Sequence, residues 1–178
     1  MYKGNNPTAI ASQKSILNSL NQLMEEKEYK DISVSELCNR SGVSRQTFYS
    51  LFGKKENVLL YQLELSYSSE RNYDDDSVIT LKETCKRYAK YVSSNYKHLK
   101  MMIENDLEEV ISMYFYYAIF SCKPMFIKLN DEEREYASNF VASGLCRLTK
   151  TYIEKNKEVN SKELCKLSYK LLSGSIYQ

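Results

Sequence analysis

The sequence predicts an all-α fold of about nine helices. Only two prolines and five glycines occur in 178 residues, so few positions interrupt a helix. Apolar residues recur every three or four positions, and no segment alternates as a half-buried strand does. A polar and charged stretch, Arg71 to Asp76, predicts a loop between two modules. We therefore expect two helical domains.

The composition disfavours several classes of protein. A hydrophobic share of 43% excludes wholesale disorder, and a net charge of +2 gives no global reason to expect nucleic acid. Five scattered cysteines without a Cys-x-x-Cys pair predict reduced, mostly buried thiols. His98 is the single histidine, which disfavours an enzyme or a metal site, and we expect no cofactor. Neither a membrane span nor a signal peptide is visible, so we expect a cytoplasmic protein.

The first predicted helix covers residues 8–28. It follows Pro7, and its apolar residues form one stripe: Ile10, Ile16, Leu17, Leu20, Leu23 and Met24. Two short helices come next, at 33–41 and about 44–51. Ser33 and Glu36 form a capping box for the first, Gly42 permits a tight turn, and Ser44 caps the second. A further helix is expected at 54–69. Together these elements predict a helix-turn-helix.

The second short helix keeps a polar face after its apolar residues are placed in the core. Phe48 and Phe52 are four residues apart and are expected to face inward. The remaining face consists of hydrogen-bonding side chains without an acidic one: Arg45, Gln46, Thr47, Tyr49 and Ser50. Base edges and phosphates require such a face. The stretch from Arg40 to Lys55 also holds four basic residues and no acidic residue.

The segment GVSRQTFYSLFGKKENVL resembles the DNA-binding signature of the TetR family of bacterial transcriptional regulators. The matching residues are Gly42, Val43, Ser44, Thr47, Phe48, Tyr49, Phe52, Lys55, Glu56 and Val58. The resemblance implies the following DNA-binding residues: Ser44, Arg45, Gln46, Thr47, Tyr49, Ser50, Lys54 and Lys55. Arg45 and Gln46 are the candidates for base edges, while Thr47, Tyr49 and Lys55 would contact phosphates.

Five more helices are predicted, at 77–95, 96–104, 107–128, 130–155 and 161–173. Ser77 is expected to cap the first of them, and Pro124 to kink or end the third. The third is so rich in aromatic residues that it is expected to be buried on most sides. Two interpretations of its aromatic cluster stay open, namely an effector pocket and plain core. The candidate pocket residues are Tyr88, Met113, Tyr114, Tyr117 and Phe120.

The last two predicted helices resemble the pair through which members of this family form homodimers. Each has an apolar face that a short domain cannot easily bury by itself. The candidate interface residues are Phe140, Val141, Gly144, Leu145, Leu148, Leu164, Leu167 and Leu171. Two subunits would also bring two helix-turn-helix units to successive major grooves.

The resemblance therefore implies a helix-turn-helix DNA-binding domain at 1–53, a connecting helix at 54–69 and an effector-binding and dimerisation domain at 70–178. The main hypothesis is a homodimeric transcriptional regulator, a repressor that binds a palindromic operator in double-stranded DNA and is released by a small hydrophobic or aromatic effector. The alternative is an adaptor or co-activator controlled by a partner protein, because the compact C-terminal part resembles a subgroup that includes co-activators of the dihydroxyacetone kinase operon. The operator, the effector, the regulated genes and the sign of regulation are not predicted.

Overall fold

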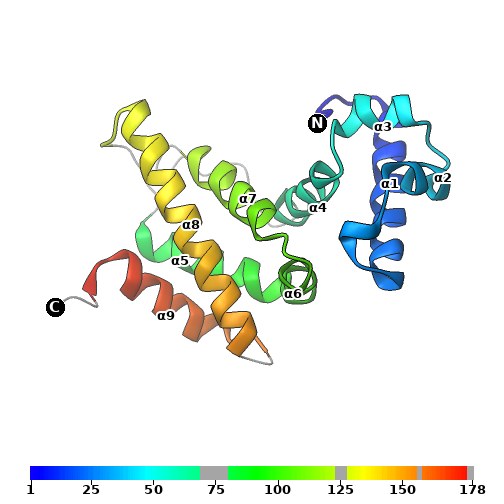
Figure 1. The fold of residues 1–178 in the computed structure, drawn as a ribbon. Coiled ribbons are helices and arrows are strands. Elements are labelled where there is room, and N and C mark those ends of the chain that lie inside the picture. The colour runs from blue at the N-terminus through cyan, green and yellow to red at the C-terminus, as the bar shows by residue number, and fades with distance from the viewer. Residues whose placement is uncertain (69–79, 123–127, 156–157, 176–178) are drawn as a thin grey trace. The chain divides into compact units, whose positions relative to one another are not determined.

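The computed structural model describes residues 1–68, 80–122, 128–155 and 158–175 (Figure 1). Within these residues the fold is all-α, as predicted, with nine α-helices, one 3-10 turn and no strand. The elements are α1 (Pro7–Glu26), η1 (Tyr29–Asp31), α2 (Val34–Ser41), α3 (Arg45–Phe52), α4 (Glu56–Ser68), α5 (Leu81–Ser94), α6 (Tyr96–Glu104), α7 (Glu108–Phe120), α8 (Asp131–Lys155) and α9 (Ser161–Leu172).

The chain divides into two compact units, Met1–Ser68 and Ser69–Gln178. Helix α4 belongs to the first unit, although the sequence suggested a connector. Thr80 caps α5 by accepting a hydrogen bond from the Glu83 amide, and α7 ends at Phe120, eight residues before the predicted end at residue 128. The predicted loop at Arg71–Asp76, the cap at Ser77 and the kink at Pro124 lie outside the described residues.

The N-terminal unit is built around α1. Helix α1 contacts α2, α3 and α4, and each of these helices has fully buried apolar residues (Figure 1). The side chains least accessible to solvent are Ile16, Leu20, Leu23, Leu37, Phe48, Phe52, Leu59 and Leu63. Burying each one contributes about 1.5–3 kcal/mol to folding. The core therefore fixes the orientation of α3 against α1.

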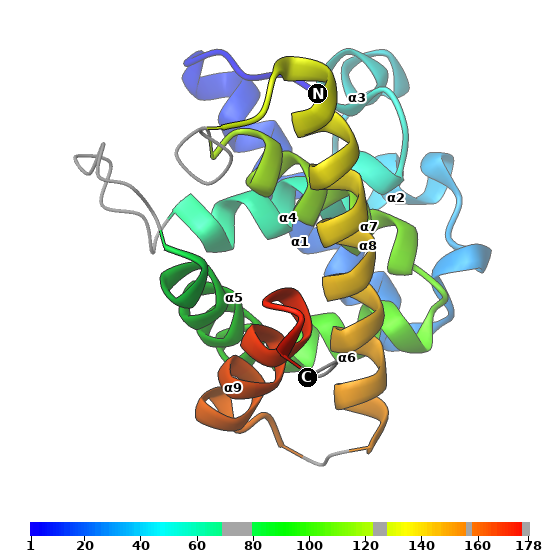
Figure 2. The same cartoon turned by 90° about the vertical axis from the view of Figure 1, so that its left-hand side faces the viewer.

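The C-terminal unit packs α7 against α8 and α5 against α9 (Figure 2). An aromatic cluster lies in its core, where Tyr91 stacks on Tyr114 at 5.2 Å between ring centroids and both Tyr88 and Tyr91 meet the edge or face of Phe115. Where α5 meets α8, the buried hydroxyls of Tyr88 and Thr149 are 2.8 Å apart and form a hydrogen bond with each other. Hydrogen bonding at this depth is what allows tyrosines to pack as core residues.

None of the helices in the described residues combines the length and the apolar run needed to cross a bilayer. The five cysteines are free thiols, as predicted. Cys38, Cys85 and Cys146 are buried, and Cys122 and Cys165 are half-buried. Burial raises the pKa of the Cys146 thiol to about 11, so this thiol is in its neutral form at neutral pH.

His98 on α6 gives the protein a predicted sensitivity to acid. Burial lowers its pKa from 6.5 to about 4, and its Nε2 atom has no hydrogen-bond partner among the described residues. Between these pH values the unfolded chain binds a proton at His98 that the folded chain does not. The free energy of unfolding should therefore fall as pH drops from about 6.5 to 4, by up to about 1.4 kcal/mol per pH unit. Urea titrations across this range should show a shallower fall for His98→Leu. Parallel pH profiles for the two proteins would contradict the prediction.

Candidate nucleic-acid interface

Local hydrogen bonds define both ends of α3. Ser44 adopts an extended conformation and its Oγ accepts a hydrogen bond from the Thr47 amide at 3.1 Å, as expected of an N-cap. Gly42, in the turn before it, has φ +67°, and Gly53, after the helix, has φ +73°. A side chain would strain the backbone at both positions. The predicted helix-turn-helix is therefore present, with α2 and α3 as its two helices.

The two faces of α3 differ as the sequence predicted. Phe48 and Phe52 are completely buried, and Leu51 is nearly so. The six polar side chains expected to meet DNA here are all exposed: Ser44, Arg45, Gln46, Thr47, Tyr49 and Ser50. The structure thus collects on one short helix and its N-cap a guanidinium, an amide and four hydroxyls. Such groups can donate and accept hydrogen bonds with base edges and phosphates.

Fewer positive charges are available near α3 than the four basic residues between Arg40 and Lys55 suggest. The Arg40 guanidinium donates to both carboxylate oxygens of Glu26, at 2.5 and 3.0 Å, which raises the pKa of Arg40 and lowers that of Glu26. Lys54 is exposed, and within the described part of the chain neither Lys54 nor Arg45 has an ion-pair partner. These two cations per subunit are therefore available to DNA.

Lys55 does not present its ammonium group to solvent as the phosphate role requires. Its Nζ donates to the carbonyl oxygens of Tyr29, at 2.7 Å, and of Ile32, at 2.6 Å, and lies 3.9 Å from the centre of the Tyr29 ring. Desolvation lowers its pKa. The same tyrosine donates from its hydroxyl to Glu56 at 3.2 Å. Lys55 therefore ties the loop between α1 and α2 to the start of α4, a role that a linear motif does not reveal.

Replacing Lys55 by Met should destabilise the N-terminal unit by about 1.5–3 kcal/mol, because two carbonyl oxygens lose charged donors. Urea unfolding followed by circular dichroism measures this loss. Lys54→Met is the matched control: it removes a neighbouring exposed lysine and should leave the unfolding midpoint unchanged. If Lys55→Met unfolds like Lys54→Met and instead reduces only the salt dependence of DNA binding, the phosphate role is correct.

Sequence reasoning missed Asn57. Its side-chain Nδ2 donates to the carbonyl oxygen of Phe52 at 2.6 Å and so satisfies one of the last carbonyls of α3. Helix ends leave such carbonyls without partners inside the helix. Asn57 lies near the end of the signature segment, on α4, and nothing in its local sequence shows that its side chain turns back toward α3.

The five candidate effector residues do not line one pocket in the structure. Tyr88 and Tyr114 are buried in the aromatic core, with 7% and 4% of their surface exposed, whereas Tyr117 is 49% exposed. Met113 and Phe120 are half-buried, and Arg134 of α8 lies over the Phe120 ring. Residues 113, 117 and 120 share a face of α7 that does not contain Tyr114. The prediction of a single pocket is therefore corrected: Tyr88 and Tyr114 belong to the core, whereas the other three residues lie at or near the surface of α7.

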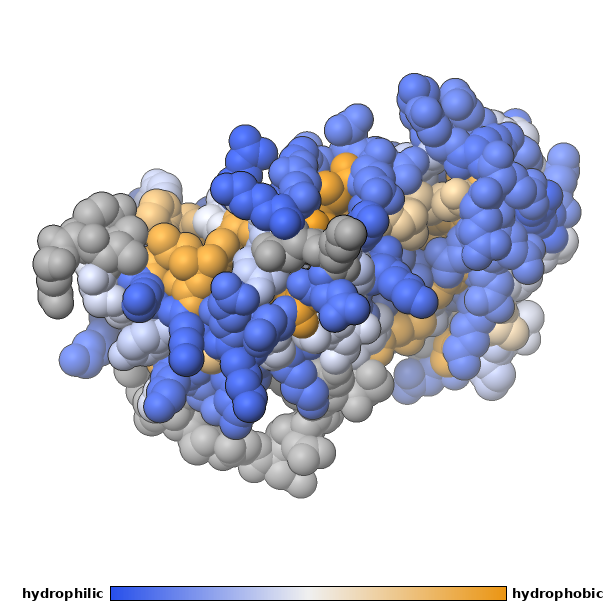
Figure 3. All heavy atoms as spheres, turned by 90° about the horizontal axis from the view of Figure 1, so that it is seen from below, coloured by the Kyte–Doolittle hydropathy of each residue, from blue (hydrophilic) through white to orange (hydrophobic). Residues whose placement is uncertain are grey.

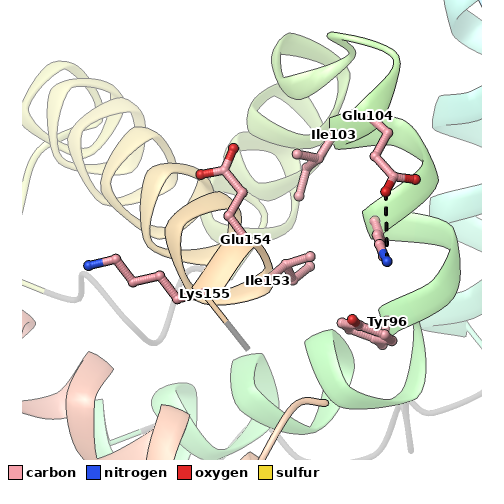
Figure 4. Close-up of a pocket in the computed structure, with 7 residues that line it drawn as sticks. Tyr96, Ile103, Glu104, Ile153, Glu154 and Lys155 are labelled. Carbon is pink, nitrogen blue, oxygen red and sulfur yellow. Dashed lines mark ion pairs between the residues drawn. The ribbon is translucent and has the colours of Figure 1, made fainter. Parts of the chain in front are cut away.

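Hollows in the C-terminal unit occur elsewhere. The larger one described, of about 550 Å³, lies between α6 and the end of α8 (Figure 4). Ile103 and Ile153 provide apolar surface there, while Glu104, paired with Lys100 at 3.7 Å, and Glu154 provide charge. A second, of about 380 Å³, lies between α7 and α8 beside Cys146 and Arg147. Neither includes a predicted effector residue.

The candidate dimer residues also divide into two groups. Leu145 and Leu164 are buried within the subunit and cannot meet a second copy, which corrects their assignment. Phe140 is 79% exposed, Gly144 is exposed, and Val141 and Leu148 are half-buried along the outer side of α8. Leu167 and Leu171 of α9 are 37% and 40% exposed. Hydrophobic surface is visible among the hydrophilic side chains in Figure 3.

Comparison with known proteins identifies a family match that lies within the N-terminal unit. Residues 16–61 match the family described as "Bacterial regulatory proteins, tetR family". The chain is 41% identical over 54 residues to the HTH-type transcriptional regulator EthR of Mycolicibacterium smegmatis, a match that covers 30% of this chain and 25% of that protein. It is 32% identical over 68 residues to the HTH-type dhaKLM operon transcriptional activator DhaS of Lactococcus lactis, covering 38% and 36% of the two chains. These matches therefore span about a quarter to a third of the relatives, and neither relative is named as an enzyme.

Solved structures extend the likeness to the whole fold. The crystal structure of Lin0861 from Listeria innocua superposes with a TM-score of 0.78 at 15% identity, covering 100% of this chain and 97% of that one. The dihydroxyacetone kinase operon activator DhaS gives a TM-score of 0.54 at 21% identity, covering 94% and 97%. The fatty acid degradation regulator FadR from Bacillus halodurans gives 0.55 at 18%, covering 96% of each chain. At these identities the likeness concerns the fold.

Proposed function

We propose that this chain, which belongs to the tetR family of bacterial regulatory proteins through its N-terminal helix-turn-helix, is a homodimeric repressor that binds a palindromic operator and is released by a small molecule. The exposed, non-acidic polar face of α3 is the observation that carries the proposal. Arg45 and Gln46 stand at its N-terminal end, where a helix in the major groove meets base edges. Thr47, Tyr49 and Lys54 would contact phosphates.

Homodimerisation is supported by the apolar surface left on α8 and α9. The outer stripe of α8 contains Phe140, Val141, Gly144 and Leu148, all exposed or half-buried in the single subunit. Two copies related by a twofold axis could bury these stripes against each other, as in a four-helix bundle. A dimer also doubles the small number of available cations. Twofold symmetry of the dimer then predicts a palindromic operator. We propose that the protein acts in the cytoplasm, where it meets the DNA.

The experiment is to select duplexes from a random-sequence pool with the purified protein and to measure binding over a range of salt concentrations. Selection of an inverted repeat, with affinity that falls as a power of the salt concentration, is the expected result. Random duplex of equal length should bind at least about a thousandfold more weakly. Selection of no sequence, or of a site without internal symmetry, would remove the proposal.

A second candidate function is activation controlled by a partner protein. The observation that favours it is the similarity to DhaS, a transcriptional activator, in both sequence and fold. Control by a partner protein is also consistent with the burial of Tyr88 and Tyr114, two of the predicted effector residues, in the packed aromatic core. If an effector binds instead, the 550 Å³ hollow between α6 and α8 has the size of a small-molecule site.

Fractionated cell extract distinguishes the two candidates. We expect the fraction that passes a small-molecule filter to release the purified protein from its selected DNA, and Ile103→Trp, which fills the hollow, to abolish that release. If only the retained macromolecular fraction changes DNA binding, control by a partner protein is the correct function.

A further inference from the structure

We propose that residues 1–6, here called the N-terminal arm, hold the C-terminal end of α3 in place and thereby position the DNA-reading face. The proposal rests on the DNA-binding function proposed above. It assigns a role to a segment that lies outside the helix-turn-helix motif and outside the residues 16–61 that match the family.

The arm supplies a hydrogen bond that α3 cannot supply itself. The last carbonyl oxygens of a helix have no partner within it. In α3 the Tyr49 carbonyl accepts from the Gly53 amide at 2.9 Å and the Phe52 carbonyl accepts from Asn57. The Leu51 carbonyl accepts from the backbone amide of Tyr2 at 2.7 Å. Because Leu51 is only 4% exposed, little water can replace this donor.

The arm is itself anchored on two other helices. The carbonyl oxygen of Tyr2 accepts a hydrogen bond from Nε2 of Gln13 on α1 at 3.2 Å. Gln13 is a polar residue with only 2% of its surface exposed, so this bond satisfies a buried amide. Lys3 forms an ion pair with Glu64 on α4. The arm therefore links α1, α3 and α4 through one short stretch of chain.

The arm is also folded on itself. The Tyr2 hydroxyl accepts from the Asn6 amide at 3.1 Å, and Asn6 in turn caps α1 by accepting from the Thr8 amide at 2.9 Å. A Cβ added to Gly4 would overlap the Tyr2 hydroxyl oxygen, so a larger residue would displace the ring from this position. These contacts hold the Tyr2 amide where it meets the Leu51 carbonyl.

The arm is expected to affect the position of the α3 side chains on the DNA and to leave the charge of the DNA-binding surface almost unchanged. Tyr49 and Ser50 lie in the last turn of α3, directly before Leu51. If this turn frays, the side chains on it lose their fixed positions on the DNA. Phosphate contacts such as the one proposed for Tyr49 fix the register of the helix on the duplex, so losing them also displaces Arg45 and Gln46 from the base edges. Loss of the arm should therefore reduce binding to the selected operator more than binding to random DNA.

The test uses the full chain and three variants, with the duplex selected by the wild-type protein and a random duplex as probes. Deletion of residues 2–5 removes the arm but retains Asn6 as the cap of α1. Gln13→Met removes the anchor of the Tyr2 carbonyl while keeping the volume of the side chain. Lys3→Met is the matched control, because it removes the charge and the ion pair but leaves the backbone bond to Leu51.

We expect the deletion and Gln13→Met to weaken operator binding by about tenfold, the scale of a single base contact, with the salt slope and random-DNA affinity unchanged. Lys3→Met should change operator affinity by less than about twofold. A lower unfolding temperature with unchanged operator affinity below that temperature would overturn the proposal in favour of a purely stabilising role. A reduced salt slope in the deletion and in Lys3→Met alike would overturn it in favour of a phosphate contact.

Amide hydrogen exchange without DNA tests the arm independently of the proposed function. In the deletion, the Phe52 and Gly53 amides should exchange at least about tenfold faster, because the last turn of α3 opens more often. Amides in the middle of α1 serve as the internal reference. Unchanged exchange at Phe52 and Gly53 contradicts the arm's role even if the wild-type protein selects a palindrome. Faster exchange in a protein that selects no DNA sequence removes the proposed function and leaves the structural role of the arm in place.

Discussion

Phe140→Glu is expected to convert the protein from dimer to monomer. Its affinity for the operator should then fall by at least about 100-fold, because linking two binding domains in one dimer raises affinity by at least about that factor. Phe140 is 79% exposed in the single subunit, and it lies on the outer stripe of α8 opposite the buried side that faces α7. Burying one such side chain contributes about 1.5–3 kcal/mol, and a twofold interface contains it twice. A carboxylate at this position would be buried without a partner.

The measurements are sedimentation velocity for the oligomeric state and titration of the selected duplex for affinity. Asn139→Glu is the matched control, because it adds the same charge one residue away, at an exposed position outside the apolar stripe. The control should remain dimeric and bind the operator normally. If Phe140→Glu remains dimeric, the interface lies elsewhere. If it becomes monomeric and still binds with full affinity, the protein reads single half-sites.

The N-terminal unit could be predicted closely because its information is local. Ser33 and Ser44 cap α2 and α3 within three residues, and Gly42 accounts for the turn between them by its own lack of a side chain. The spacing of Phe48 and Phe52 was enough to orient α3. Each of these inferences depends on contacts between residues that are close in sequence.

The errors concern contacts between residues distant in sequence. Lys55 was expected at a phosphate because it is basic and begins a helix, yet its partners are carbonyls 26 and 23 residues earlier. Leu145 and Leu164 have the helical spacing of an interface, but the same spacing describes a side that faces the subunit's own core. The aromatic residues of α7 were grouped by composition, whereas the turn of the helix directs Tyr114 inward and Tyr117 outward.

Arg45→Ala is expected to remove most of the sequence discrimination at one base pair in each half-site, which amounts to about 1–3 kcal/mol per contact. Arg45 is exposed at the first position of α3, after the Ser44 cap, and among the described residues it has no ion-pair partner. Its guanidinium therefore gives up no ion pair within the protein when it binds a guanine through two hydrogen bonds. Alanine favours the helix, so the fold should be unaffected.

Two further variants separate base reading from charge. Arg45→Lys keeps the charge but cannot make the same planar pair of hydrogen bonds, so it should lose discrimination while keeping the salt slope. Lys54→Ala should weaken the selected and random duplexes equally and reduce the salt slope by about 0.9 for each phosphate that the protein no longer neutralises. Binding to duplexes with each base substituted in turn measures the discrimination. The prediction is contradicted if Arg45→Ala loses equal affinity for selected and random DNA and Arg45→Lys keeps full discrimination. Arg45 would then contact a phosphate, and Gln46 would remain as the candidate for reading the sequence.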